Sequence, residues 1–145
     1  MEKAIHVTLH GDPIGKPRMT QADKWRRRPV VLTYRAWADK ARYAVRAAPP
    51  AIGVQVDGQF PAGLYDVSWM AFIAMPASWS KKKKDALRGK PHFGKPDRDN
   101  IDKAILDALF PDDRGVTSGA LHKRWDDGLG PRIELVVTKL EGVMP

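Results

Sequence analysis

The chain has 145 residues, no cysteine, and 25 lysines and arginines against 17 acidic residues, which gives a formal net charge of +8. This length is typical of one domain with its own core, and the lack of cysteine excludes disulfide scaffolds and cysteine nucleophiles. No run approaches the roughly 20 apolar residues that span a bilayer, and the first twelve residues lack the apolar block of a signal peptide. We therefore expect a soluble, cytoplasmic protein with no membrane partner, whose basic surface attracts nucleic acid.

The first half of the chain predicts a strand, a helix and a second strand. Residues 4–10 alternate between apolar and polar side chains, which is typical of a half-buried strand. Residues 32–48 carry apolar side chains three and four positions apart with arginines opposite, which predicts an amphipathic helix. After a connection at 51–63, residues 65–74 are apolar on both faces and predict a central strand.

The second half predicts two helices followed by two strands. The helices are expected at 78–89 and 100–109, and the strands at 119–125 and 131–140. Residues 112–118 are expected to be a turn, and the two strands are expected to pair as a hairpin. The order of elements predicts an α+β fold, with a mixed sheet packed against helices in a single domain that spans residues 1–145.

The segment GKPDRDNIDKAILDALFPDD, residues 94–113, gathers acidic side chains in this basic chain. Asp97 and Asp99 lie at the start of the predicted 100–109 helix, so both carboxylates can reach one point outside the backbone. Two carboxylates at so short a distance repel each other unless a cation lies between them. Mg²⁺ takes one or two protein carboxylates together with water and substrate phosphate. Asp112 or Asp113 could supply a third ligand if the chain folds back after the helix.

The same acids also have a simpler interpretation as helix caps and solvated charge. Aspartate is favoured at helix N-termini, and Lys103 lies four residues after Asp99, where an ion pair can form. Alternatively, Lys103 could offset the negative charge that develops on a phosphate during its cleavage. An EF-hand loop does not fit, because Ile101 occupies its fifth position. A D-x-D nucleotide-sugar site is an alternative, but the basic surroundings favour a polymeric substrate. Spacing alone leaves a metal site and solvated acids as alternatives.

Residues 16–46 are the most basic part of the chain, with ten lysines and arginines against Asp23 and Asp39. Side chains of this kind contact phosphates and supply affinity without sequence information. Trp25 could stack on an exposed base or anchor its loop in the core, and we expect the anchor. The side chains that we expect to bind DNA are Lys16, Arg18, Arg26, Arg27, Arg28 and Arg98.

At KPDRDNIDKAILDAL the chain resembles the RusA family of Holliday junction resolvases, which are small phage- and prophage-associated endodeoxyribonucleases. The family pattern is D-x-D-N, a lysine four residues after the second aspartate, D-A-L, and an acidic pair before a valine. The residues that match it are Asp97, Asp99, Asn100, Lys103, Asp107-Ala108-Leu109 and DDRGV at 112–116. The GKPRMT loop and the HKRW…GPRIELVV segment also resemble phage members, so the resemblance extends from about residue 4 to residue 140.

The resemblance implies a homodimer that uses Mg²⁺ or Mn²⁺ and nicks paired strands of four-way DNA junctions symmetrically. It implies that Asp97, Asp99 and Asp113 bind the metal and that Lys103 is a catalytic lysine. The alternative is a non-catalytic, basic module that binds nucleic acid and uses its acids as helix caps.

The chain departs from the family pattern in the spacing before the acidic pair and in the DDRGV stretch, where the family often has DDSQV or DDAQV. Many members have more residues between D-A-L and the acidic pair, where this chain has only Phe110-Pro111. Asp113 is preferred to Asp112 as the third ligand, because it keeps the family's three-residue step to Val116.

Overall fold

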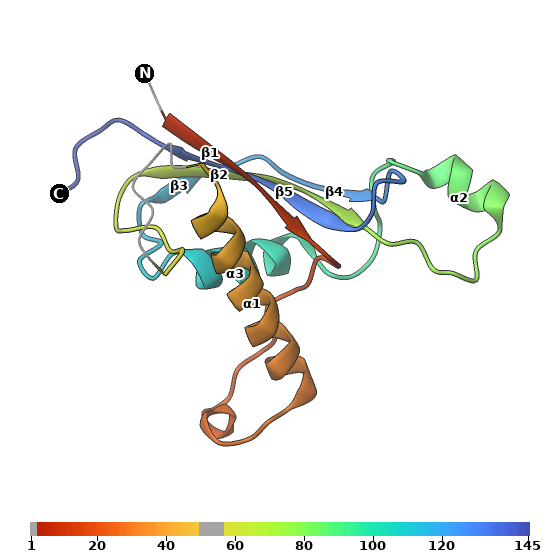
Figure 1. Ribbon diagram of the computed structural model, residues 1–145, viewed down its shortest axis with the longest axis horizontal. Coiled ribbons are helices and arrows are strands. Elements are labelled where there is room, and N and C mark those ends of the chain that lie inside the picture. The colour runs from red at the N-terminus through yellow and green to blue at the C-terminus, as the bar shows by residue number, and fades with distance from the viewer. Residues whose placement is uncertain (1–2, 50–56) are drawn as a thin grey trace.

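A mixed five-stranded sheet forms the centre of the protein (Figure 1). The computed structural model describes residues 3–49 and 57–145, so the predicted connection at 51–63 lies partly outside them. The strands are β1 (Lys3–His10), β2 (Tyr65–Ile73), β3 (Val116–Ser118), β4 (Leu121–Trp125) and β5 (Arg132–Lys139). β5 pairs antiparallel with β1 and β2, whereas β3 and β4 pair parallel with β2. The predicted α+β class with a mixed sheet is confirmed.

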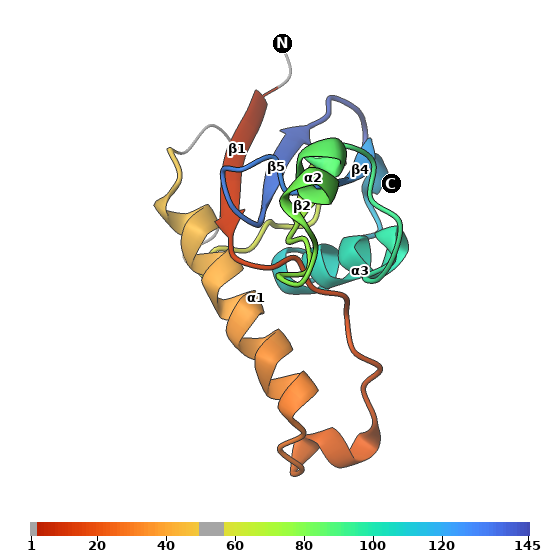
Figure 2. The same cartoon turned by 90° about the vertical axis from the view of Figure 1, so that its right-hand side faces the viewer.

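Three α-helices and a short 3-10 helix accompany the sheet within the described residues. They are η1 (Gln21–Lys24), α1 (Pro29–Ala47), α2 (Lys81–Leu87) and α3 (Arg98–Leu109). α1 packs against β1 and α3, and α2 lies beyond the end of the sheet, away from both (Figure 1). Figure 2 shows η1 and the N-terminal part of α1 extending past the sheet and α3. None of these helices is long and apolar enough to cross a membrane.

β2 is the central strand, as its apolar sequence predicted. β5 lies along one edge of it, and β3 and β4 follow one another along the other edge. The predicted hairpin between 119–125 and 131–140 is therefore wrong, because β2 separates β4 from β5. The chain does turn between these two strands, since the Asp126 carboxylate accepts hydrogen bonds from the Gly128 and Gly130 amides at 3.3 and 3.0 Å. After the turn the chain continues into β5 on the other side of β2, instead of pairing with β4.

The turn predicted at 112–118 also contains a short strand. Residues 116–118 form β3, which pairs with the start of β2. Its backbone comes close to the loop before β2, because a Cβ atom added at Gly115 would overlap the carbonyl oxygen of Gly63. Three residues are too few to show an alternating pattern, which is why the sequence did not predict the strand.

The core lies between one face of the sheet and the helices α1 and α3. The inward residues of the three longest strands are buried, and α3 adds a fully buried stripe. This stripe consists of Ile101, Ala104, Ile105, Ala108 and Leu109, each 0% exposed. The apolar positions that predicted the 100–109 helix are therefore the positions that pack in the core. The charged residues of the helix lie on its opposite face.

A buried arginine holds the start of β5. Arg132 is 6% exposed, and its guanidinium donates to the two carboxylate oxygens of Asp127 at 3.0 Å each and to Glu134 at 2.9 Å. It also lies over the ring of Phe72, 4.0 Å from the centroid. The hydrogen bonds from Arg132 lower the pKa of Asp127 from 3.8 to about 2, against the opposing effect of burial.

This pKa predicts how acid affects stability. Because the folded pKa of Asp127 is below its ordinary value, the pair stabilises the fold fully above about pH 4 and loses this effect as the pH falls toward 2. In Asp127→Asn this contribution is missing, so the free energy of unfolding should fall less between pH 4 and 2 than in the wild type. Urea unfolding followed by tryptophan fluorescence measures the difference, and equal pH dependence of the two proteins would contradict the assignment.

The α3 stripe predicts a second effect on stability. Ile105→Ala removes a fully buried side chain, and the resulting cavity should lower the free energy of unfolding by about 2–5 kcal/mol. Leu129→Ala, at a position that is 81% exposed, is the matched control and should change it by less than about 0.5 kcal/mol. Urea titrations of both variants provide the test, and similar effects of the two substitutions would rule out the packing described for α3.

Candidate active site

The solvent-facing side of α3 forms one wall of a cavity of about 550 Å³. The loop before η1 and the turn after α3 form the rest. The residues that line it are Lys16, Pro17, Arg18, Met19, Asp99, Asp102, Lys103, Leu106, Asp107 and Asp113. The cavity thus brings cations and carboxylates from three separate segments together.

The turn after α3 folds back toward the helix despite the short Phe110-Pro111 link. Phe110 is 3% exposed, and its ring packs on Phe60 at 4.9 Å and edge-on against Tyr65 at 5.2 Å. With Phe110 held in the core, the chain reverses immediately, and Asp113 lines the same cavity as Asp99 and Lys103.

Asp97 occupies the N-cap position of α3 but does not cap it through its side chain. It lines a neighbouring cavity of about 510 Å³, together with Lys95 and Asn100. Lys16 lines both cavities, so the two adjoin. In residues 3–49 and 57–145, no three histidine, aspartate or glutamate side chains lie close enough together to hold a metal ion. Asp97, Asp99 and Asp113 therefore surround the site without forming a closed cluster.

Three acids of the 94–113 segment have a definite partner. Asp102 accepts a hydrogen bond from the Trp69 indole Nε1 at 2.9 Å, and Asp107 accepts one from the Lys16 Nζ at 2.7 Å. Asp112 accepts two from the Arg114 guanidinium, at 2.9 and 2.8 Å. These bonds lower the pKa of Asp112 to about 2. Each of these carboxylates thus has a structural role that accounts for it.

The other three acids of the segment have no such partner. Asp97, Asp99 and Asp113 are exposed, and in the part of the chain that the structure describes their carboxylates make no hydrogen bond or ion pair. Lys103 is exposed as well, and the ion pair with Asp99 that its spacing allowed is absent from the described residues. The unpartnered acids are thus the same three that the RusA resemblance implied as ligands.

The loop before η1 is fixed against the first turn of α3. The Lys16 amide donates to the Asn100 carbonyl at 3.1 Å, and a Cβ atom at Gly15 would lie 3.2 Å from the Asn100 Cβ. The Lys16 ammonium lies 4.8 Å from the centroid of the Tyr34 ring. Burial, together with the nearby Asp107 charge, raises the pKa of Tyr34 to about 12, so the phenol stays neutral.

Lys123, in β4, binds the backbone of residues 94–96, the segment that leads into α3. Its ammonium donates to the carbonyl oxygens of Gly94 and Pro96, at 2.7 and 2.9 Å, and so fixes the backbone that leads into Asp97. Sequence reasoning did not single out Lys123. Its role depends on β4 lying beside this loop, which no local pattern indicates.

The predicted DNA-binding cations fall into two groups. Lys16 pairs with Asp107, and Arg28 donates to both carboxylate oxygens of Asp23 at 2.8 and 2.7 Å. The other four are exposed, and their side chains have no polar partner among the described residues. These four are Arg18, Arg26, Arg27 and Arg98.

The expected core anchor at Trp25 is wrong, because this side chain is 72% exposed. The loop is anchored instead by Asp23, which is 4% exposed and had counted in the sequence only as a minor offset to the basic charge.

The comparison with protein families agrees with this geometry. The family model described as Endodeoxyribonuclease RusA matches residues 10–138, which include the loop before η1, all of α3 and the turn after it. No individually curated protein matches the sequence. Since the match covers nearly the whole chain, the protein belongs to the RusA family of endodeoxyribonucleases.

Proposed function

We propose that the protein is a Mg²⁺- or Mn²⁺-dependent endonuclease that resolves four-way DNA junctions by paired, symmetric nicks. Membership of an endodeoxyribonuclease family supports the reaction class. The observation that carries the proposal is the division of the acids around α3. Asp97, Asp99 and Asp113 stay without a partner in the described structure although the protein is rich in cations, and an unneutralised group of this kind is suited to a metal ion.

Carboxylate oxygens are the ligands that Mg²⁺ and Mn²⁺ prefer. Asp97, Asp99 and Asp113 would hold the ion, which when bound polarises the scissile phosphate and activates a water for in-line attack. Lys103 contributes a positive charge beside the phosphate, where it offsets the charge that develops on the phosphate oxygens. Asp102 and Asp107, through Trp69 and Lys16, keep the helix and the loop in position.

The DNA backbone would be held by the cations that surround the cavity. Arg18, Arg26, Arg27 and Arg98 are exposed and have no polar side-chain partner within residues 3–49 and 57–145, so their guanidinium groups can contact phosphates. Lys16 lines the cavity, and the Arg28 side chain is 37% exposed, so both can present part of their charge to phosphate while paired. A C2 homodimer fits this substrate, because it presents the same surface to two symmetry-related strands of a junction.

The neighbouring acids at 112 and 113 allow a matched test of the metal ligands. We expect wild-type protein to cut a synthetic four-way junction with Mg²⁺ and to stop when EDTA is added. Asp113→Asn removes a ligand charge and should slow single-turnover cleavage by about 100-fold or more. Asp112→Asn removes only a pair with Arg114 and should retain cleavage within a few-fold. Gel analysis of labelled junction strands measures both rates.

Two outcomes of this experiment would count against the proposal. Equal loss of cleavage in Asp112→Asn and Asp113→Asn would show that the ligand assignment is wrong. Wild-type protein that binds junctions for hours with Mg²⁺ or Mn²⁺ and yields no product would favour a non-catalytic binding module. Junction binding by Asp113→Asn should be equal to the wild type or tighter, because a charge that repels phosphate is lost.

Lys103 has a separate expected effect. Lys103→Met keeps most of the side-chain length but removes the charge, so the single-turnover rate should fall about 100- to 1,000-fold. The dissociation constant for a junction, measured in EDTA, should change far less, because one phosphate contact is a small part of the total. An unchanged cleavage rate would mean that Lys103 serves only as a solvated surface charge.

A further inference from the structure

An exposed tryptophan, to which the proposed function gives no role, lies on the arm that carries most of the proposed DNA-binding arginines. The arm comprises residues 17–28, between the loop at α3 and the start of α1, and it includes η1. Figures 1 and 2 both show this segment at the far end of α1, beyond the sheet. Trp25 is 72% exposed there. A large aromatic side chain in water at the end of a projecting segment is a feature of binding surfaces.

The arm is held together by an ion pair between the buried Asp23 carboxylate and the partly exposed Arg28 guanidinium. The Asp23 carboxylate accepts from the Thr20 amide at 2.6 Å and from the Arg28 guanidinium at 2.8 and 2.7 Å. Arg28 also donates to the Arg18 carbonyl at 2.8 Å, and Arg35 donates to the Asp23 carbonyl at 3.1 Å. Through these bonds Asp23 and Arg28 connect the two ends of the arm to each other and to α1. The backbone that carries Trp25 is part of this bonded segment, since the Trp25 amide donates to the Ala22 carbonyl at 3.1 Å, so less of the arm has to be ordered when it binds.

The residues around Trp25 indicate the chemistry of its partner. Lys24, Arg26 and Arg27 are exposed, and their side chains have no polar partner within the described ranges. An aromatic face between unpaired cations matches a nucleic acid strand, which offers bases for stacking and phosphates for the cations. An apolar protein partner would leave these three charges without a counter-ion.

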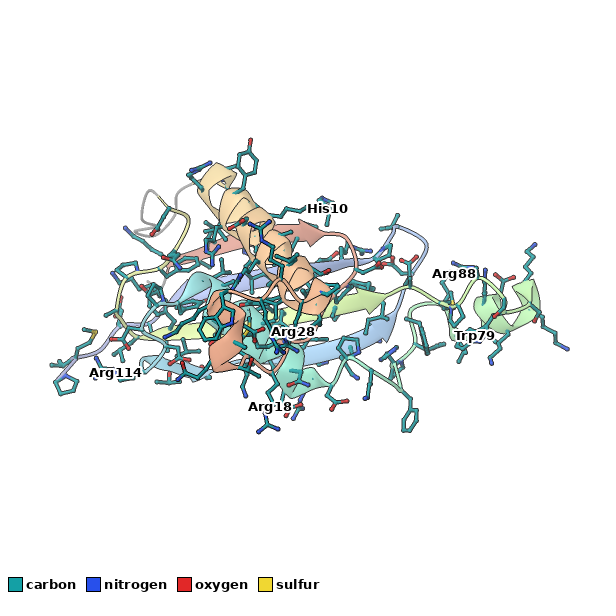
Figure 3. All side chains as sticks on the ribbon, turned by 90° about the horizontal axis from the view of Figure 1, so that it is seen from below. His10, Arg18, Arg28, Trp79, Arg88 and Arg114 are labelled. Atoms are coloured by element: carbon teal, nitrogen blue, oxygen red, sulfur yellow. The ribbon has the colours of Figure 1, made fainter. Side chains whose placement is uncertain are left out.

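The arm starts at the proposed active site. Pro17, Arg18 and Met19 line the same cavity as Asp99 and Lys103. Figure 3 is seen from the side on which the arm lies in Figure 1, and in this view Arg18 and Arg28 both fall between Arg114 and Trp79. A DNA strand with a phosphate in the cavity can therefore continue along the arm to Trp25. In a fully stacked duplex no base face is free, whereas bases at a branch point can unstack.

We propose that Trp25 stacks on an unstacked base beside the branch point of the DNA, while Lys24, Arg26 and Arg27 contact the adjoining phosphates. This inference rests on the proposed function as a junction nuclease and adds to it a residue that distinguishes branched from paired DNA.

The test compares the binding of a four-way junction and of a fully paired duplex of equal length, by fluorescence anisotropy in EDTA. Trp25→Ala should bind the junction roughly 5- to 150-fold more weakly, the range expected for the loss of one stacked base, with little change for the duplex. Trp25→Phe should retain part of the preference. Arg27→Ala should weaken the binding of both DNAs alike and reduce the salt dependence.

Tyr43→Ala is the matched control. Tyr43 is also an exposed aromatic residue, 65% accessible, with the Arg46 guanidinium 5.4 Å from its ring centroid. It lies near the opposite end of α1, away from the cavity, so its removal should leave the binding of both DNAs unchanged. Urea unfolding of each variant verifies that these surface substitutions preserve the fold.

The outcomes separate this inference from the proposed function. If wild-type protein cuts junctions but Trp25→Ala binds them normally, or loses junction and duplex binding equally, stacking by Trp25 is overturned and the nuclease function stands. If junction preference depends on Trp25 but no metal condition yields cleavage, the nuclease function fails and the stacking surface stands. Wild-type protein that binds neither DNA would overturn both.

Discussion

The site depends on the single apolar stripe of α3. Because the stripe is fully buried against the sheet and α1, the rotation of the helix about its axis is fixed, and Asp99 and Lys103 must face solvent. The hydrogen bond between Trp69 and Asp102 fixes the same rotation from the sheet side. Hydrophobic packing thus determines which charges α3 presents, and the loop before η1 and the turn at Asp113 complete the cavity around them.

The ion pairs around this helix show which charges serve structure. Lys16 is paired with Asp107, although Asp99 lines the same cavity. Arg114 is paired with Asp112, although Asp113 is the next residue. Neither Asp99 nor Asp113 has a side-chain partner among the residues that the structure describes. Pairing therefore does not simply neutralise the most exposed acids. It leaves Asp97, Asp99 and Asp113 without a partner in the described part of a protein whose net charge is +8.

Sequence periodicity predicted the elements but not all of their neighbours. The strands β1, β2 and β5 and the helices α1 and α3 follow from patterns that are local and long enough to be read. The pairing of β4 with β2 instead of β5 is a long-range choice, and a turn signal is compatible with both. Likewise, the RusA motif indicated Asp97, Asp99 and Asp113, whereas the contacts of Lys123 with the 94–96 backbone depend on strand placement alone.

The arm shows why charge counts alone mislead. In sequence, Asp23 is one acid among many cations and Trp25 is an apolar residue in need of burial. In the structure Asp23 is the buried residue, because a carboxylate that accepts from Thr20 and Arg28 satisfies the backbone and one cation together. An arm built only from cations would repel itself and open. One buried acid ties the arm together through hydrogen bonds while its outer surface stays basic, and the indole, not the carboxylate, is the side chain left exposed.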